Sequence, residues 1–226
     1  MSLILNIDSS SAIAFVSIAK NGVALASITN PDQKDHAGFI QTGIQQLIKE
    51  TGIELNQLDA IAVNAGPGSY TGLRVGMASA KGLCYALGKP FITINSLLIL
   101  AASCLEQVSR DPQYQDHFLC PMIDARRMEV YTALYDQDLK ILSEPQAKIL
   151  DENSFHEQLS KKRILFFGNG AMKWNELVKD ANARFFSTSE YSAAMNRLSH
   201  EAFKQSNFTE LVDSQPIYLK EFHFGK

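Results

Sequence analysis

Hydrophobic and polar positions follow two periods along this chain. Apolar residues at every second position, rich in β-branched side chains, predict strands, and apolar residues three or four apart predict amphipathic helices. In the first half these patterns follow one another in the order βββαβαβα, with Asn21-Gly22 as the two-residue hairpin turn between the second and third strands. The strands are expected over residues 3–8, 13–19, 23–29, 60–63 and 91–94, and the helices over 35–50, 71–87 and 96–108.

The same order of elements returns in the second half of the chain. It follows a polar connection at residues 109–116, and no residue-level repeat accompanies it. The strands are expected over residues 118–124, 129–135, 139–150, 164–167 and 184–186, and the helices over 151–160, 172–180 and 190–205.

Two such halves predict an α/β protein with two mixed sheets, each flanked by helices, facing each other across a cleft. This duplicated, two-lobed plan is that of the actin, Hsp70 and sugar-kinase (ASKHA) superfamily. We expect one lobe over residues 1–108 and a second over 109–206, with a hinge near Ser109. The tail, 207–226, is apolar enough to pack, and we expect it to return to the first lobe.

The stretch from 64 to 83 is the most unusual part of the sequence, because a glycine-rich turn links a short apolar strand to a helix of small residues. Gly66, Gly68 and Gly72 permit positive φ or close approach, and Pro67 stiffens the turn between them. A ligand or partner is expected here. The turn lacks the Gly-Lys-Ser/Thr of a P-loop and the last glycine of a dinucleotide fingerprint.

Within the following helix, Gly72, Gly76, Ala80 and Cys84 recur every four residues, which leaves one face almost bare of side chains. Glycine inside a helix costs about 1 kcal/mol relative to alanine, so such a stripe indicates a close contact. Two interpretations remain open: the helix lies close on its own sheet, or the stripe meets a partner.

The helix over 35–50 supplies the second half of the expected partner surface. Its apolar face carries a histidine at one end, and because both helices follow strands of one sheet, we expect their outer faces to combine into one surface. The residues assigned to this surface are His36, Ile40, Gly43, Ile44, Leu47, Gly72, Gly76 and Ala80.

Composition restricts the function further. Of 226 residues, 21 are Lys or Arg and 24 are Asp or Glu, and the formal charge of -3 makes the chain a poor binder of polyanions by itself. Three cysteines, far apart in apolar surroundings, are typical of buried thiols in a reducing compartment. The longest apolar stretch, 97–102, is too short to span a bilayer, so we expect a cytoplasmic protein that binds no membrane.

The turns that hold nucleotide phosphates in the actin-like superfamily combine glycine with an acidic residue, so that backbone N–H groups reach the phosphate. The equivalents here, 8–11 and 124–127, contain no glycine, which indicates weakened or lost ATP chemistry. Asp8 is equally interpreted as a strand-end residue that caps its own turn. A reduced phosphate-binding loop would comprise Asp8, Ser9, Ser10, Gly66, Gly68 and Ser69.

Catalytic and metal-binding patterns are absent from the sequence. The five histidines are dispersed and no two stand three or four residues apart, and no Ser-His-Asp or Cys-His set can be assembled. We therefore expect no catalytic residues, no metal and no cofactor, other than a nucleotide held weakly or shared at a partner interface.

Several segments together resemble one family. AGPGSYTGLRVGMASAKGL, LNIDSSS at the start, IDARRMEVYTALY in the middle, FFGNG and QPIYLK near the end look like the TsaB (YeaZ) family of bacterial tRNA threonylcarbamoyladenosine biosynthesis proteins. The resemblance spans essentially the whole chain, and its glycine-rich stretch is highly specific.

The resemblance implies an actin-like fold in the glycoprotease-like family and a non-catalytic partner of TsaD, the transferase that modifies adenosine 37 of tRNA. It further implies TsaE, an ATPase, as a member of the assembly, self-pairing when TsaD is absent, and contact with tRNA only through the assembly. Where the catalytic relative has a metal-binding His-x-x-x-His, this sequence has His36 and, four residues on, Ile40.

Two functions of different classes follow. One is a scaffold or activating subunit, favoured by the missing ligands, the glycine-free turns and the helix faces. The other is a stand-alone actin-like ATPase or small-molecule kinase, supported by fold analogy alone. Nucleotide affinity of the isolated protein distinguishes the two.

Overall fold

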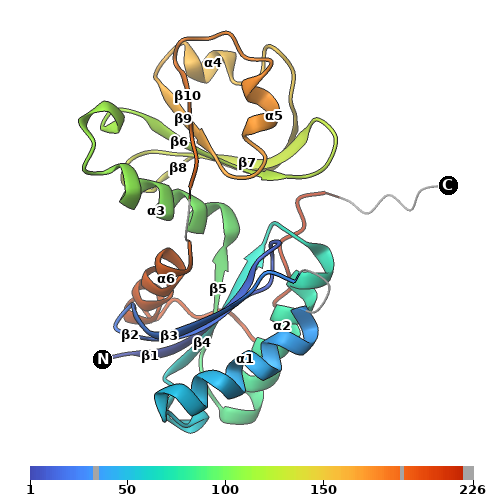
Figure 1. Cartoon of the computed structure of the whole chain (residues 1–226), viewed down its shortest axis with the longest axis vertical. Helices are drawn as coiled ribbons and strands as arrows, with labels where there is room; N and C mark the ends of the chain where they lie inside the picture. Colours follow the sequence, from blue (N-terminus) through green and yellow to red (C-terminus); the bar gives the residue numbers. More distant parts are fainter. Residues whose placement is uncertain (33–35, 189–190, 221–226) are drawn as a thin grey trace, which may run out of the picture. The chain divides into compact units, whose positions relative to one another are not determined.

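The computed structural model describes residues 1–32, 36–188 and 191–220, and only the backbone of His36 (Figure 1). The expected helix starts at Asp35 and Glu190 lie outside the described residues. The chain divides into two compact lobes. The first contains residues 1–96 and 192–217, and the second contains the described residues between 97 and 191 together with 218–220.

The first lobe is built on a five-stranded mixed sheet with the strand order β3-β2-β1-β4-β5. β1 is antiparallel to β2 and parallel to β4, and β4 is parallel to β5. Every residue of β4 is buried, as an apolar strand covered on both faces requires. The strands are β1 (Leu3–Asp8), β2 (Ala14–Lys20), β3 (Val23–Asn30), β4 (Ala60–Gly66) and β5 (Phe91–Asn95).

Helices cover both faces of this sheet: α1 (His36–Thr51) and α2 (Tyr70–Leu87) lie on one face, and α6 (Ser192–Lys204) on the other (Figure 1). The alternation in β2 reflects this, because Val16 and Ile18 join the apolar cluster under α1 and α2. Ser17, between these two residues in the sequence, points to the other face, where its Oγ donates to Asn196 Oδ1 of α6 at 2.7 Å. A short 3-10 turn, η2 (Leu55–Gln57), precedes β4.

The second lobe repeats the first. Its sheet has the order β10-β9-β6-β7-β8, with β6 antiparallel to β7 and parallel to β9, so β6 takes the place that β1 has in the first sheet. This confirms the duplicated α/β fold of the actin and Hsp70 type. The strands are β6 (Phe118–Asp124), β7 (Glu129–Tyr135), β8 (Ile141–Ile149), β9 (Ile164–Phe167) and β10 (Ala183–Phe186).

Two expected helices of the second lobe are reduced to single turns, α4 (His156–Leu159) and α5 (Met172–Asn175). Asp151 explains the first, since its carboxylate accepts from Asn153 N at 3.0 Å and from Ser154 Oγ at 3.0 Å, and this local turn competes with a helix. A 3-10 turn, η3 (Pro112–Tyr114), precedes β6.

The expected lobe boundaries at 108 and 206 are wrong by one helix each. The helix α3 (Ser96–Val108) packs its apolar side on the second sheet, where Leu97 and Cys104 share a cluster with Leu119. The last helix, α6, instead belongs to the first lobe. A helical period shows that a helix covers a sheet, but not which sheet it covers.

The segment after α6 returns to the first sheet. Thr209 N donates to Phe91 O at 2.8 Å, and Ile217 N donates to Ala65 O at 2.7 Å. Residues 207–217 are therefore part of the first lobe. Within the described residues, no helix combines the length and apolar character needed to cross a membrane.

Candidate functional site

Two segments that are distant in sequence meet at the carboxyl ends of β1 and β4. They are residues 8–11, called here the Asp8 turn, and residues 66–72, called here the glycine loop. Ser69 N donates to Ser10 O at 2.7 Å, and Ser9 Oγ donates to Gly72 O at 2.7 Å. The structure thus brings together all six residues expected in the reduced phosphate-binding loop.

A buried amide holds the Asp8 carboxylate. Asp8 Oδ2 accepts from Asn64 Nδ2 at 2.8 Å, and the same amide nitrogen lies 2.9 Å from Ser10 Oγ. Asp8 Oδ1 accepts from Ser10 N at 2.8 Å, so Asp8 caps its own turn. Asn64 Oδ1 in turn accepts from Gly66 N at 2.9 Å and from Ser96 Oγ at 2.6 Å. Asn64 therefore links the two segments.

The glycines of the loop are required by contact with the Asp8 turn. A Cβ at Gly68 would lie 2.4 Å from Ser10 O, and a Cβ at Gly72 would lie 1.8 Å from Ser9 O. Real Cβ atoms do not approach backbone oxygens so closely, so any side chain here would displace the backbone. The glycine loop thus packs on the turn that in actin-like proteins faces phosphate.

The residues expected to form the partner surface point inward, and that expectation is wrong. The side chains assigned on α1 and α2 are buried in the first lobe. A Cβ at Gly76 would lie 2.6 Å from Ser9 Oγ, and one at Gly43 would lie 2.8 Å from Val16 Cγ2. The apolar stripe of a surface helix is the face that covers its own sheet. The residues concerned are Ile40, Gly43, Ile44, Leu47, Gly72, Gly76 and Ala80; the His36 side chain lies outside the described residues.

The outer faces of α1 and α2 have a different composition. On α2 the guanidinium of Arg74 lies over the Tyr70 ring at 4.2 Å, and Tyr85 is 84% exposed. A Cβ at Gly82 would meet open space. We call eleven exposed residues of the two helices the outer helix surface: Ala37, Gly38, Gln41, Thr42, Gln45 and Gln46 of α1, and Thr71, Arg74, Ala78, Gly82 and Tyr85 of α2. Lys49 and Glu50 at the end of α1 and Ala86 at the end of α2 are also exposed and are not part of it.

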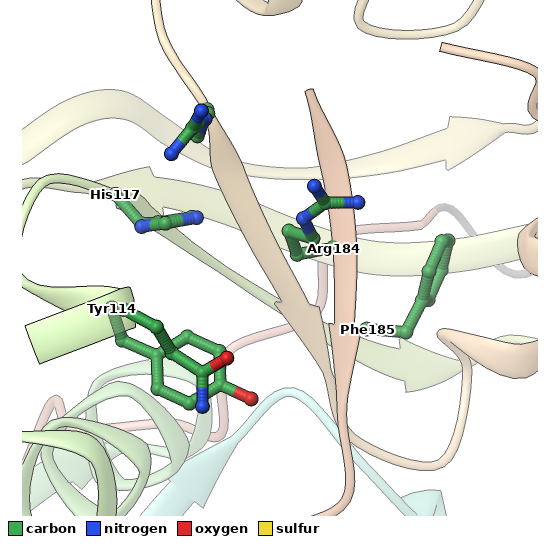
Figure 2. Close-up of a pocket in the computed structure, with 6 residues that line it drawn as sticks. Tyr114, His117, Arg184 and Phe185 are labelled. Atoms are coloured by element: carbon green, nitrogen blue, oxygen red, sulfur yellow. The ribbon is translucent and has the colours of Figure 1, made fainter. Parts of the chain in front are cut away.

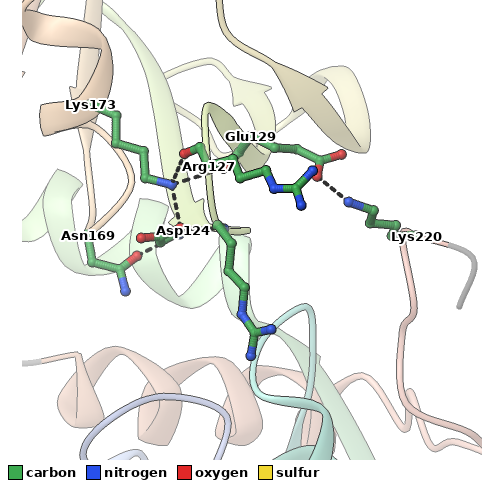
Figure 3. A network of polar contacts seen from close by, with 7 residues as sticks. Asp124, Arg127, Glu129, Asn169, Lys173 and Lys220 are labelled. Atoms are coloured by element: carbon green, nitrogen blue, oxygen red, sulfur yellow. Dashed lines mark hydrogen bonds and ion pairs between the residues drawn. The ribbon is translucent and has the colours of Figure 1, made fainter. Parts of the chain in front are cut away.

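The second turn, residues 124–127, repeats this arrangement (Figure 3). Asn169, in the loop after β9, accepts a hydrogen bond from Asp124 N at 2.8 Å. In the first lobe the corresponding asparagine, Asn64 in β4, donates to the Asp8 carboxylate. Lys173 Nζ forms an ion pair with Asp124 and donates to Arg127 O at 2.6 Å. Partial burial is the largest single influence and raises the pKa of Asp124, but the hydrogen bonds from Lys173 and Arg126 N and the charges of both residues together outweigh it, so the pKa is lowered.

Arg126 and Arg127 have φ of 70° and 49°, in the left-handed region that favours glycine. The backbone of this turn therefore takes a glycine-like conformation while it carries two exposed arginines. Sequence reasoning found both turns but missed their partners Asn64, Asn169 and Lys173. Asn64 could have been found from the sequence, because it is a polar residue near the end of a strand whose other residues are apolar.

The structure gives little support for cysteine-based or metal-based chemistry among the described residues. Burial raises the pKa of each of the thiols of Cys84, Cys104 and Cys120 to about 12, which makes them poor nucleophiles. Among the described residues, no three His, Cys, Asp or Glu side chains gather in a way that could hold a metal ion.

Comparisons with known proteins agree on one family. Residues 25–220 match the family described as TsaD, tRNA N6-adenosine threonylcarbamoyltransferase. The chain is 34% identical to the tRNA threonylcarbamoyladenosine biosynthesis protein TsaB of Haemophilus influenzae, over 96% of this chain and 93% of that protein. It is 25% identical to TsaB of Escherichia coli, over 96% of this chain and 94% of that protein.

A solved structure supports the fold. YeaZ from Pseudomonas aeruginosa superposes with a TM-score of 0.79 at 23% identity, over 97% of this chain and 100% of that chain. From the sequence matches, the chain belongs to the TsaB (YeaZ) family of tRNA threonylcarbamoyladenosine biosynthesis proteins, within the wider family described by TsaD.

Proposed function

We propose that this chain is a non-catalytic, activating subunit in the synthesis of tRNA N6-threonylcarbamoyladenosine, which binds TsaD and, through TsaD, TsaE. Membership of the TsaB family supports the pathway. The buried thiols and the tRNA pathway of the relatives support action in the cytoplasm. The observation that carries the subunit role is the outer helix surface of the first lobe.

The outer helix surface suits helix-to-helix contact. Ala78 and Gly82 of α2 leave room for a partner backbone, and Tyr85 beside them is a large exposed aromatic of the type enriched at interfaces. The neighbouring exposed positions of α1 carry small or uncharged polar residues from Ala37 to Gln46. Removing such a surface from water costs little free energy, because few charged groups would be buried.

Two helices that meet two equivalent helices form a four-helix arrangement. TsaD belongs to the same wider family as this chain, so its equivalent helices are the proposed occupants. When TsaD is absent, a second copy of the chain would occupy the same surface, and that contact must be isologous. tRNA then meets the chain within the assembly.

We expect Gly82→Leu to weaken binding of TsaD tenfold or more while the subunit stays folded. A Cβ at this position meets open space in the isolated chain, but a leucine side chain would hold two helices apart, and overpacking typically costs about 1–3 kcal/mol. Titration calorimetry with purified TsaD measures the affinity, and sedimentation measures self-pairing.

Ala193→Leu is the matched control, because Ala193 is exposed on α6 at the opposite face of the same sheet. It should leave binding unchanged. Normal TsaD binding by a folded Gly82→Leu variant would place the interface elsewhere and contradict the proposal.

The alternative, a stand-alone ATPase or small-molecule kinase, predicts nucleotide turnover by the pure chain. We expect none above background, because the glycine loop packs on the Asp8 turn and Lys173 binds the carboxylate of the second turn. A phosphate-release assay on the isolated protein makes the measurement. Turnover that is lost in the isosteric Asp8→Asn variant would establish the enzyme instead.

A further inference from the structure

A pocket of about 200 Å³ lies in the second lobe, at the edge where β6, β9 and β10 begin (Figure 2). The second turn, residues 124–127, follows the other end of β6, roughly 20 Å away at about 3.3 Å per residue, so the pocket is separate from that turn. Its walls are formed by Gln113, Tyr114, His117, Arg163, Arg184 and Phe185.

Two guanidinium groups make the pocket positive. Arg163 precedes β9 and Arg184 lies in β10, the parallel strand beside it. Two carboxylates near the pocket already have partners: Asp116 pairs with Lys162 Nζ at 2.6 Å and interacts only electrostatically with Arg163, and Asp111 accepts from Gln113 Nε2 at 2.5 Å. Within residues 1–32, 36–188 and 191–220, no carboxylate forms an ion pair with either arginine. Both cations are therefore available to an anion.

His117 forms the buried part of the wall. It is 2% exposed, its ring meets that of Tyr114 edge-on at 5.9 Å, and its Nδ1 has no hydrogen-bond partner among the described residues. Figure 2 shows the ring directed toward Arg184. Burial first, and the charge of Arg163 second, lower the pKa of His117, so the ring is neutral at pH 7 and the positive charge resides on the arginines.

We propose that this pocket binds the phosphate group of a phosphorylated ligand. Guanidinium groups bind phosphate oxygens bidentately. Tyr114 lines the same pocket, whereas the Gln113 amide already donates to Asp111 Oδ2 at 2.5 Å. At about 200 Å³ the pocket is smaller than the roughly 300–1,000 Å³ that encloses a drug-sized ligand, so it holds a phosphate and part of a sugar, with the remainder outside.

The phosphate has two sources with the same chemistry, an RNA backbone or a small phosphorylated metabolite. One contact with phosphate adds little RNA affinity by itself, which agrees with a chain of net charge -3. The site goes beyond the proposed subunit role, because none of its residues lies on the outer helix surface of the first lobe.

The test is an NMR titration of the isotope-labelled full chain, following arginine Nε–H signals and the His117 ring. Inorganic phosphate and adenosine monophosphate should shift these signals with saturation at a Kd on the order of 1 mM, whereas adenosine and sodium chloride should not. Arg163→Gln and Arg184→Gln should each weaken phosphate binding about tenfold, and Arg184→Lys should restore only part of it.

Lys49→Gln is the control, since it removes an exposed cation at the end of α1 in the first lobe. It should leave phosphate affinity unchanged. Shifts that follow ionic strength without saturation, or that persist in both arginine variants, would overturn the proposal. Because both arginines are exposed, neither variant should disturb the fold, and circular dichroism checks this.

A single-stranded RNA hexamer distinguishes the sources. If RNA is the ligand, the hexamer binds more tightly than adenosine monophosphate, and Arg184→Gln lowers the slope of log affinity against log salt by about 0.7. Equal affinity for hexamer and monophosphate identifies a small phosphorylated ligand. Absence of arginine-dependent binding by every phosphate-bearing probe contradicts the site.

Discussion

Replacing Gly72 with alanine should destabilise the first lobe by about 3 kcal/mol, although only one methyl group is added. That methyl carbon would lie 1.8 Å from the backbone oxygen of Ser9, and a backbone oxygen cannot turn away as a flexible side chain can. Either α2 must leave β1 or the Asp8 turn must open, and both changes break the hydrogen bond from Ser9 Oγ to Gly72 O.

Gly82→Ala is the matched control on the same helix. Its methyl group meets open space, and alanine is the better helix former, so this variant should be more stable by about 0.5–1 kcal/mol. Hydrogen exchange of the β1 and β4 amides measures the stability of the first lobe. Trp174, the single tryptophan of the chain, reports separately on the second lobe by fluorescence. Equal exchange rates in Gly72→Ala and Gly82→Ala would show that the contact between Gly72 and the Ser9 backbone is not rigid.

Asn64→Asp should cost about 4 kcal/mol of first-lobe stability at pH 7. The substitution keeps the size of the side chain, but it replaces the amide that donates to Asp8 at 2.8 Å with a second carboxylate. Two buried carboxylates at this distance cannot both be charged, so one takes up a proton and its pKa rises by several units, each worth about 1.4 kcal/mol.

The effect has a defined pH dependence. A carboxyl group with a raised pKa in the folded state favours folding at low pH, and this advantage is lost as pH rises above the unfolded value near 4. The stability gap between Asn64→Asp and the parent chain should therefore be small at pH 4 and widen toward pH 7. Hydrogen exchange of β1 and β4 at several pH values measures it.

Asn21→Asp provides the comparison. Asn21 is exposed and its Oδ1 accepts from Ser2 N at 2.9 Å, a role that a carboxylate also fills. This variant should change stability by less than about 0.5 kcal/mol at any pH. A flat pH profile for Asn64→Asp would mean that the Asp8 carboxylate is not held as the structure shows.

The sequence by itself determined the order of elements in both lobes. Alternating and helical periods are local properties, so they predict strands and helices without knowledge of the fold. The Asn21-Gly22 hairpin is an example, because both residues need positive φ, and the structure has φ of 52° and 81° there. The repeated order then predicted two similar sheets, which the strand orders confirm.

Only the tertiary structure decided which surfaces those elements present. The period of α2 predicts a bare stripe, but its contact with Ser9, more than sixty residues earlier, decides that the stripe faces the sheet and that Gly82 faces outward. The same holds for the exchange of α3 and α6 between the lobes, and for the partners Asp8 and Asn64. Each of these depends on contacts between residues far apart in the chain, and local patterns carry no information about such distances.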